Sequence, residues 1–392
     1  MNEDEKLTEE NDLEDYDTVE VEQKDKQETT GSVVEDYPNL SIKIEQAQYS
    51  IFELKRRYDK GKICLDPDFQ RNAVWNQRQK SELIESVIMG IPLPLIYLAE
   101  NEDGKLVVVD GRQRLSTFFE FLDDKFKLKN LKILSQINGM SMKEMDADSV
   151  YSRYATTIED TQLVVQIIKY PTKDRVRFDI FDRVNRGGTP LNKQEMRNAL
   201  YQGAATKLLK DLSEMDSFQK ATGSAVSGKH MKDRYIILRA LCFYLLFKKE
   251  LLDKSGNVLV YRSDMEEFLG CGMQFFNGME ASELEKLKKL FDQTMQTANH
   301  CLGPDGFRIP SDGKIKRPIS MTLFETLFYY YTLFDESDDY VSMRKGIQEL
   351  LDDAEYLKSL QHSVDSSVNV KRRFEKVTTK FKEIMDAQKT GD

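Results

Sequence analysis

Histidine and paired cysteine are scarce in this sequence of 392 residues. Its three histidines, His230, His300 and His362, lie far apart, and none of its four cysteines forms a C-x-x-C pair. This leaves little material for a zinc hydrolase, an HNH nuclease or a Ser-His-Asp triad. Unpaired cysteines are also typical of a reduced compartment. Any catalysis is therefore expected to depend on Asp, Glu, Arg, Lys and Gln side chains.

Long apolar runs are missing as well. No run approaches the roughly 18 apolar residues that a membrane span needs. The first ten residues, MNEDEKLTEE, have neither the basic nor the apolar region of a signal peptide. We therefore expect a cytoplasmic chain that does not enter a membrane.

The net charge of −10 belongs mainly to the N-terminal segment. Residues 1–36 hold 15 of the 67 acidic residues and only 3 of the 57 basic ones, so the remaining residues carry a net charge of +2. Because this segment has few large apolar residues and no periodicity, we expect residues 1–38 to be a disordered acidic tail. The tail is either a solubilising arm or an acidic mimic that covers a basic site. A nearly neutral body can still carry a basic cleft, so nucleic acid is not excluded.

The remaining residues predict an α+β chain of two domains. In the first, 39–204, short strands and helices alternate, which favours a small mixed sheet; in the second, 205–392, almost every segment has a helical pattern. Asn76 and Gln79 form a predicted capping box, as do Asn192 and Glu195. Strands are predicted at 94–100, 105–110 and 161–170, and helices at 77–88, 115–122, 174–184 and from 193 to about Gly203.

The sequence Asp110-Gly111-Arg112-Gln113-Arg114 lies where a predicted strand passes into a helix. Gly111 allows a tight turn, and the following helix N-terminus favours an anion. Arg112 and Arg114 carry forked donors that match phosphate oxygens, and Asp110 could hold Mg²⁺ or orient a water molecule. The alternative is a tight turn whose arginines pair with nearby acids. Spacing alone does not separate these two interpretations.

A second candidate segment is Asp66-Pro67-Asp68-Phe69-Gln70-Arg71, followed by Trp75. Gln70 and Arg71 could present an amide and a guanidinium to a nucleotide, and Trp75 could stack on a base. The alternative places Phe69 and Trp75 in the core and Arg71 on the surface.

The third candidate is Asn185-Arg186-Gly187-Gly188-Thr189. Successive glycines before a capped helix can form an anion-binding nest of backbone N–H groups. Arg197, one turn inside that helix, could face the same cavity. A plain helix–helix turn is the alternative.

Taken together, these segments resemble a known family. The stretches DPDFQRNAVW, IESVIMGIPLPLIYL, VVDGRQRLSTFFEFL and FDRVNRGGTPLNKQEMRNALYQG are similar to the N-terminal domain family of the GmrSD modification-dependent restriction endonucleases. The resemblance implies a ParB/sulfiredoxin-like core. The usual D-G-Q-Q-R of that family reads D-G-R-Q-R here, so Arg112 adds a positive charge.

The resemblance also implies an activity at this loop, namely binding and hydrolysis of a nucleotide in antiphage DNA defence, for which we expect an NTP and Mg²⁺. Asp110, Gln113 and Arg114 would be catalytic, and Asp110 would also hold the metal. Larger relatives append a His-dependent nuclease domain, and the C-terminal half here has no H-N-H pattern, so DNA cutting would fall to a separate nuclease subunit. Two other functions stay open, a nuclease acting on DNA through the same loop and a regulatory module that binds without turnover. A homo-oligomer also stays open. The remaining residues of the nucleotide pocket would be Gly111, Arg112, Gln70, Arg71, Trp75, Asn185, Arg186, Gly187 and Arg197.

Overall fold

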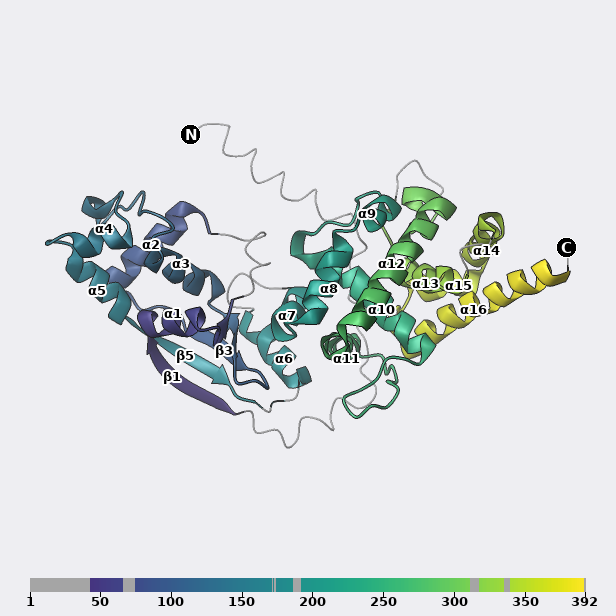
Figure 1. Cartoon of the computed structure of the whole chain (residues 1–392), viewed down its shortest axis with the longest axis horizontal. Coiled ribbons are helices and arrows are strands. Elements are labelled where there is room, and N and C mark those ends of the chain that lie inside the picture. The colour runs from purple at the N-terminus through teal and green to yellow at the C-terminus, as the bar shows by residue number, and fades with distance from the viewer. Residues whose placement is uncertain are drawn as a thin grey trace. The chain divides into compact units, whose positions relative to one another are not determined.

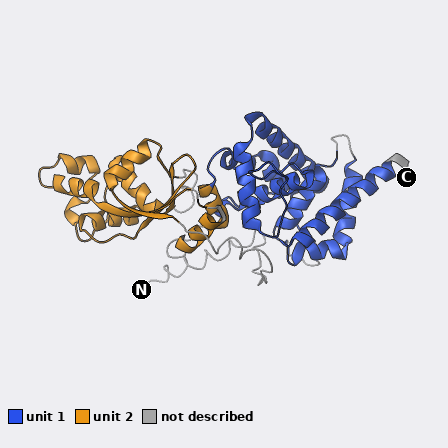
Figure 2. Ribbon diagram, turned by 90° about the horizontal axis from the view of Figure 1, so that it is seen from below, with its two compact units in different colours: residues 1–29, 201–392 blue, residues 30–200 orange. Residues whose placement is uncertain are grey.

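The computed structural model describes residues 43–65, 75–170, 172, 174–185, 192–310, 317–334 and 339–390. The predicted tail at 1–38 lies outside these residues. Two compact units meet in sequence between Leu200 and Tyr201 (Figure 2). We call the described residues 43–200 the N-terminal unit and 201–390 the helical unit.

The N-terminal unit is built on a mixed sheet of five strands in the order β1-β5-β3-β4-β2. The outer strand β1 is antiparallel to β5, β5 is parallel to β3, β3 is antiparallel to β4, and β4 is parallel to the short β2. Three of these strands, β1, β5 and β3, are labelled in Figure 1. The strands are β1 Ile44–Ser50, β2 Ile63–Cys64, β3 Ile96–Glu100, β4 Leu106–Asp110 and β5 Gln162–Ile168.

The helices of this unit begin where the sequence supplies a cap. Asn76 and Gln79 form the predicted capping box at the start of α2, with both hydrogen bonds at 3.0 Å. Ser50 caps α1 by accepting from the Glu53 N–H. The helices are α1 Ile51–Asp59, α2 Gln77–Ile88, α3 Arg112–Leu122, α4 Met142–Ala147, α5 Ser152–Asp160, α6 Asp174–Asn185 and α7 Lys193–Leu200, with a short 3₁₀ turn at Ser135–Ile137.

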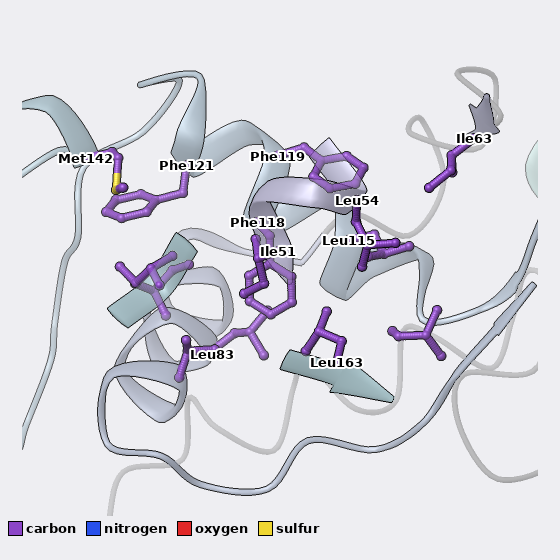
Figure 3. Packing of buried hydrophobic residues seen from close by; sticks show 14 of the residues in the cluster. Ile51, Leu54, Ile63, Leu83, Leu115, Phe118, Phe119, Phe121, Met142 and Leu163 are labelled. Carbon is purple, nitrogen blue, oxygen red and sulfur yellow. The ribbon is translucent and has the colours of Figure 1, made fainter. Parts of the chain in front are cut away.

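A hydrophobic core fills one face of the sheet. Phe118 and Phe121 of α3, Ile51 of α1 and Leu83 of α2 are buried together with Leu163 of β5 (Figure 3). Because side chains alternate along a strand, the burial of every apolar residue of β4 shows that this strand is covered on both faces.

Leu106 and Val108 belong to this hydrophobic core, whereas the buried Val107 and Val109 do not. Helices α6 and α7 pack against β4, and their buried residues also lie outside this core. These two helices therefore cover the second face of β4, the strand that ends at Asp110.

The helical unit is organised around two apolar helices, α10 and α13, which pack against each other. Both helices are rich in aromatic residues, and every residue of α13 from Thr322 to Tyr331 is buried. The helices are α8 Ala204–Ser213, α9 Asp216–Thr222, α10 Lys232–Lys248, α11 Met265–Gly278, α12 Ala281–Leu302, α13 Met321–Tyr331, α14 Tyr340–Asp352, α15 Ala354–Gln361 and α16 Ser367–Thr390. No helix within the described ranges is long and apolar enough to cross a membrane.

Buried charges join three helices of this unit. Glu325 of α13 accepts hydrogen bonds from Arg239 of α10, at 2.8 Å, and from Arg373 of α16. Arg239 also donates to Asp365, at 2.8 Å, in the segment before α16. Two arginines and two acids therefore balance in charge, which offsets the cost of removing them from water.

The predicted fold class is confirmed, since a small mixed sheet precedes an almost entirely helical unit. Two predicted helix boundaries are wrong. Helix α3 begins at Arg112, three residues before the predicted start, because Gly111 starts it directly after the strand. Helix α7 ends at Leu200, and Gly203 is the N-cap of the next helix, α8.

Candidate functional site

The turn from β4 to α3 brings Asp110 and Arg114 together. Gly111, between them, has φ 93° and is the N-cap of α3. A Cβ atom at this position would lie 2.3 Å from Ile96 Cδ1. Only glycine satisfies both the left-handed backbone and this close approach. The glycine therefore fixes how Arg112, Gln113 and Arg114 follow the strand.

Arg114 is anchored on three protein oxygens. Its Nη2 donates to Asp110 Oδ2 at 2.9 Å and to the Leu95 carbonyl at 3.1 Å, while its Nη1 donates to the Pro94 carbonyl. Burial lowers the pKa of the Arg114 guanidinium, and the carboxylate of Asp110 opposes that shift. A guanidinium remains charged in proteins despite such a shift. Arg114 therefore holds Asp110 and the start of β3 in place.

Asp110 keeps contact with solvent while it is held. Its side chain is 33% exposed, against 11% for Arg114. The carboxylate is thus oriented by a buried partner and still reachable from outside. This arrangement suits a group that must meet a ligand or a water molecule. The predicted role of Arg114 as a phosphate ligand stays a prediction, because both of its terminal nitrogens are engaged with protein oxygens.

Gln113 connects this turn with Trp75. Its side-chain oxygen accepts from the Trp75 backbone N–H at 3.4 Å. The Trp75 ring is partly buried and packs against the hydrophobic core of Figure 3. Trp75 thus lies beside the turn, and packing accounts for part of its ring. Base stacking by this ring stays a prediction. Arg112 is half-buried in the first turn of α3.

Arg197 lies in α7, and its side chain is fully buried. Its Nη1 donates to Gln194 Oε1 at 2.9 Å, and its guanidinium lies 5.7 Å from the centre of the Phe178 ring. The predicted capping box of this helix is confirmed. The Asn192 N–H donates to Glu195 at 2.8 Å, and the Glu195 N–H donates to Asn192 at 2.9 Å.

Other predicted residues are placed only in part. Asn185 is the last residue of α6. Gln70, Arg71, Arg186 and Gly187 lie outside the residues that the structure describes. Asn185 and Arg197 lie in α6 and α7, and both helices pack against β4, the strand that ends at Asp110.

Two parts of this arrangement are not predicted from the sequence. The carbonyls of Pro94 and Leu95 hold Arg114, yet backbone acceptors leave no signal in residue types. Buried polar side chains on α6 and α7, namely Arg177, Gln194 and Asn198, were also missed. The segment KQEMRNAL holds five polar residues among eight, a composition that ordinarily predicts a solvent-exposed helix, so it gave no signal of their burial.

The fit of Mg²⁺ to this turn rests on one carboxylate. Within the described ranges, no three His, Cys, Asp or Glu side chains come together as a metal site. Mg²⁺ is commonly bound by one or two carboxylates together with the phosphates of a substrate. Asp110 therefore suits a metal that arrives with a phosphorylated ligand, and it does not form a metal site by itself.

The N-terminal unit is similar to a known protein family. Residues 51–202 match the family described as GmrSD restriction endonuclease, N-terminal domain. The match begins with α1 and ends just after α7, so it contains the Asp110–Arg114 turn and both helices that pack on β4. A search of curated proteins finds no match. Residues 51–202 form a domain that belongs to the GmrSD restriction endonuclease N-terminal domain family.

Proposed function

We propose that this protein binds and hydrolyses a nucleoside triphosphate in a restriction-type defence against foreign DNA. The defence role is supported by the family of residues 51–202, whose description names a restriction endonuclease. The proposal that the protein binds and hydrolyses a nucleotide rests on the turn between β4 and α3. The core of the N-terminal unit is proposed to be ParB-like.

One observation carries the proposal, namely the ion pair between Asp110, at the end of β4, and Arg114, in the first turn of α3. Gly111, in a left-handed conformation, starts this helix between them. A helix N-terminus attracts anions through its N–H groups and its dipole. Arg112 adds a positive charge in the first turn. The turn thus combines an anion-attracting helix end with an oriented, solvent-accessible carboxylate.

These groups fit the hydrolysis of a phosphoanhydride. Water adds to the γ-phosphorus while the bond to the bridging oxygen of the β-phosphate breaks, which yields a nucleoside diphosphate and phosphate. Asp110 accepts a hydrogen bond from the attacking water, and Arg112 stabilises charge on the phosphoryl oxygens. Arg114 keeps the carboxylate in position. Bound Mg²⁺, which Asp110 would help to hold, would neutralise phosphate charge.

DNA and a second protein are proposed as partners. A separate nuclease subunit is proposed to cut the DNA. Nucleotide hydrolysis would then control that subunit. A homo-oligomer stays a prediction.

Fluorescence of the single tryptophan tests this function. Trp75 lies beside Gln113, so a nucleotide at the turn should change its emission. ATP, GTP, CTP and UTP are titrated with and without Mg²⁺, and phosphate release is measured in parallel. Binding with phosphate release supports the proposal, and binding without release supports a regulatory module. Plasmid nicking with Mg²⁺ and no nucleotide would instead favour direct nuclease action.

A further inference from the structure

Helix α7 buries an unusual amount of polar side chain. Gln194 is 3% exposed, Arg197 0% and Asn198 1%. Buried polar side chains normally have hydrogen-bonding partners, because losing water without a replacement is costly. Each of these side chains should therefore be satisfied by the protein or by a ligand.

Only one of the two polar atoms of the Gln194 amide has a hydrogen-bond partner among the described residues. Its Oε1 accepts from Arg197 Nη1 at 2.9 Å. Because a guanidinium donates and never accepts, the atom that faces it must be the amide oxygen and not the nitrogen. The amide nitrogen, Nε2, is also buried, and it has no hydrogen-bond partner among the residues that the structure describes. A fixed donor is thus left without an acceptor.

We propose that Gln194 donates this N–H to a phosphate oxygen of the bound nucleotide. The inference rests on the proposed function and adds to it a residue of the phosphate site. Arg197 makes Gln194 a pure donor by occupying its oxygen, so the group it meets must be an acceptor.

An anionic acceptor fits the surroundings better than a neutral one. Arg197 lies within hydrogen-bonding distance of Gln194, and Arg177 is buried on the neighbouring helix α6. Both helices pack against β4, the strand that ends at Asp110. Hydrogen bonds to charged groups are stronger than bonds between neutral groups. Gln194 therefore acts on the triphosphate and not on the base.

The variant Gln194→Glu tests this directly. A glutamate keeps an oxygen for Arg197 and replaces the N–H donor by a second oxygen, which repels phosphate. The control is Gln48→Glu, which adds the same charge at an exposed position of β1 in the same unit. Affinities for ATP, GTP and inorganic triphosphate are measured by calorimetry, together with the melting temperature without ligand.

We expect Gln194→Glu to melt like the wild type and to bind all three probes at least about tenfold more weakly. Gln48→Glu should bind them as the wild type does. Equal affinity of Gln194→Glu would overturn the inference and leave the proposed function standing, and a loss confined to one nucleotide would overturn it in favour of a base contact. If the wild type binds none of the probes, both fail. Should the glutamate variant not fold, Gln194→Met replaces it with the same expectation.

Discussion

Arg114 reaches back one helical turn to Asp110, with 2.9 Å between Nη2 and Oδ2. The same guanidinium donates to the carbonyls of Pro94 and Leu95, just before β3. One side chain thus joins the ends of two neighbouring strands to the first turn of α3. Arg114 is therefore a positioning residue, and Asp110 is the residue that it presents.

Replacement of Arg114 by methionine should lower the stability of the N-terminal unit. The change leaves a carboxylate and two carbonyls without their shared donor, which typically costs about 3 kcal/mol when the pair is largely buried. Urea unfolding followed by Trp75 fluorescence measures this, since Trp75 is the only tryptophan and lies in that unit.

The matched control is Arg78→Met, which removes an ion pair with Glu82 in the same unit. Arg78 is 58% exposed and Glu82 is 44% exposed, so the loss should stay within about 0.5 kcal/mol. Equal effects of the two methionine variants would show that Arg114 has no positioning role.

Gly111→Ala should destabilise the turn for two reasons. The residue must adopt φ 93°, and its Cβ would lie 2.3 Å from Ile96 Cδ1. Strain of this kind costs on the order of 1–3 kcal/mol. Valine at position 96 lacks Cδ1, so Gly111→Ala should cost less in an Ile96→Val background.

Gly104→Ala isolates the backbone contribution to this loss. Gly104 has φ 71°, and a Cβ there would meet no atom within 4 Å. The alanine variant should therefore lose only the left-handed strain. A loss at Gly104 as large as at Gly111 would contradict the steric explanation. The two losses are compared by urea unfolding of each variant.

Glu325→Gln should strongly destabilise the helical unit. The change leaves Arg239 and Arg373 buried with one carboxylate, that of Asp365, in place of two. Breaking such a buried network costs about 3–5 kcal/mol. Thermal unfolding followed by circular dichroism measures the loss. A melting temperature equal to that of the wild type would mean that the network adds no stability.

The stability of the helical unit should fall at acidic pH in part through Asp353. Hydrogen bonding to Lys376, at 2.6 Å, lowers the pKa of this carboxyl, and its acceptance of the Tyr356 and Glu355 N–H groups adds to the shift. Because the folded-state pKa is below the unfolded one, the contribution is complete above the ordinary pKa of an aspartate carboxyl, about 3.9, and disappears as pH falls through the folded pKa.

Asp353→Asn tests that contribution, since asparagine can still cap α15 but carries no charge for Lys376. About a third of the Asp353 side chain is exposed, so screening should limit the difference at pH 7 to about 1 kcal/mol. The difference should vanish near pH 2. Urea unfolding at both pH values measures it, and a difference that persists at low pH would contradict the assignment to ionised Asp353.

Local patterns in the sequence predicted much of the N-terminal unit. The capping residues Asn76 and Asn192 correctly predicted the starts of α2 and α7, because a cap depends on nearby residues alone. Helix α4 carries the same local signal, a capping box of Ser141 with Glu144, which the prediction did not use, whereas the 3₁₀ turn at Ser135–Ile137 and helix α5 have no side-chain cap. Their packing depends on contacts across the fold, such as Glu85 accepting from the Ile133 and Leu134 N–H groups.

The candidate site was predictable in its residue types and less so in its contacts. The sequence placed Asp110 and Gly111 at the end of a strand, where the structure has them. It left undecided whether the arginines meet acids or a ligand. For Arg114 the structure gives an acid and two carbonyls, which only the pairing of β3 with β4 brings within reach.

The steady-state rate of NTP hydrolysis by Asp110→Asn tests the central claim most directly. Asparagine keeps an oxygen for Arg114 and removes the charge that orients water and would help to hold Mg²⁺. With Mg²⁺ and saturating nucleotide, a loss of at least about a hundredfold in kcat is predicted, with the N-terminal unit still folded at the assay temperature although the ion pair with Arg114 is lost. Turnover by Asp110→Asn equal to that of the wild type, or no turnover by the wild type itself, would contradict it.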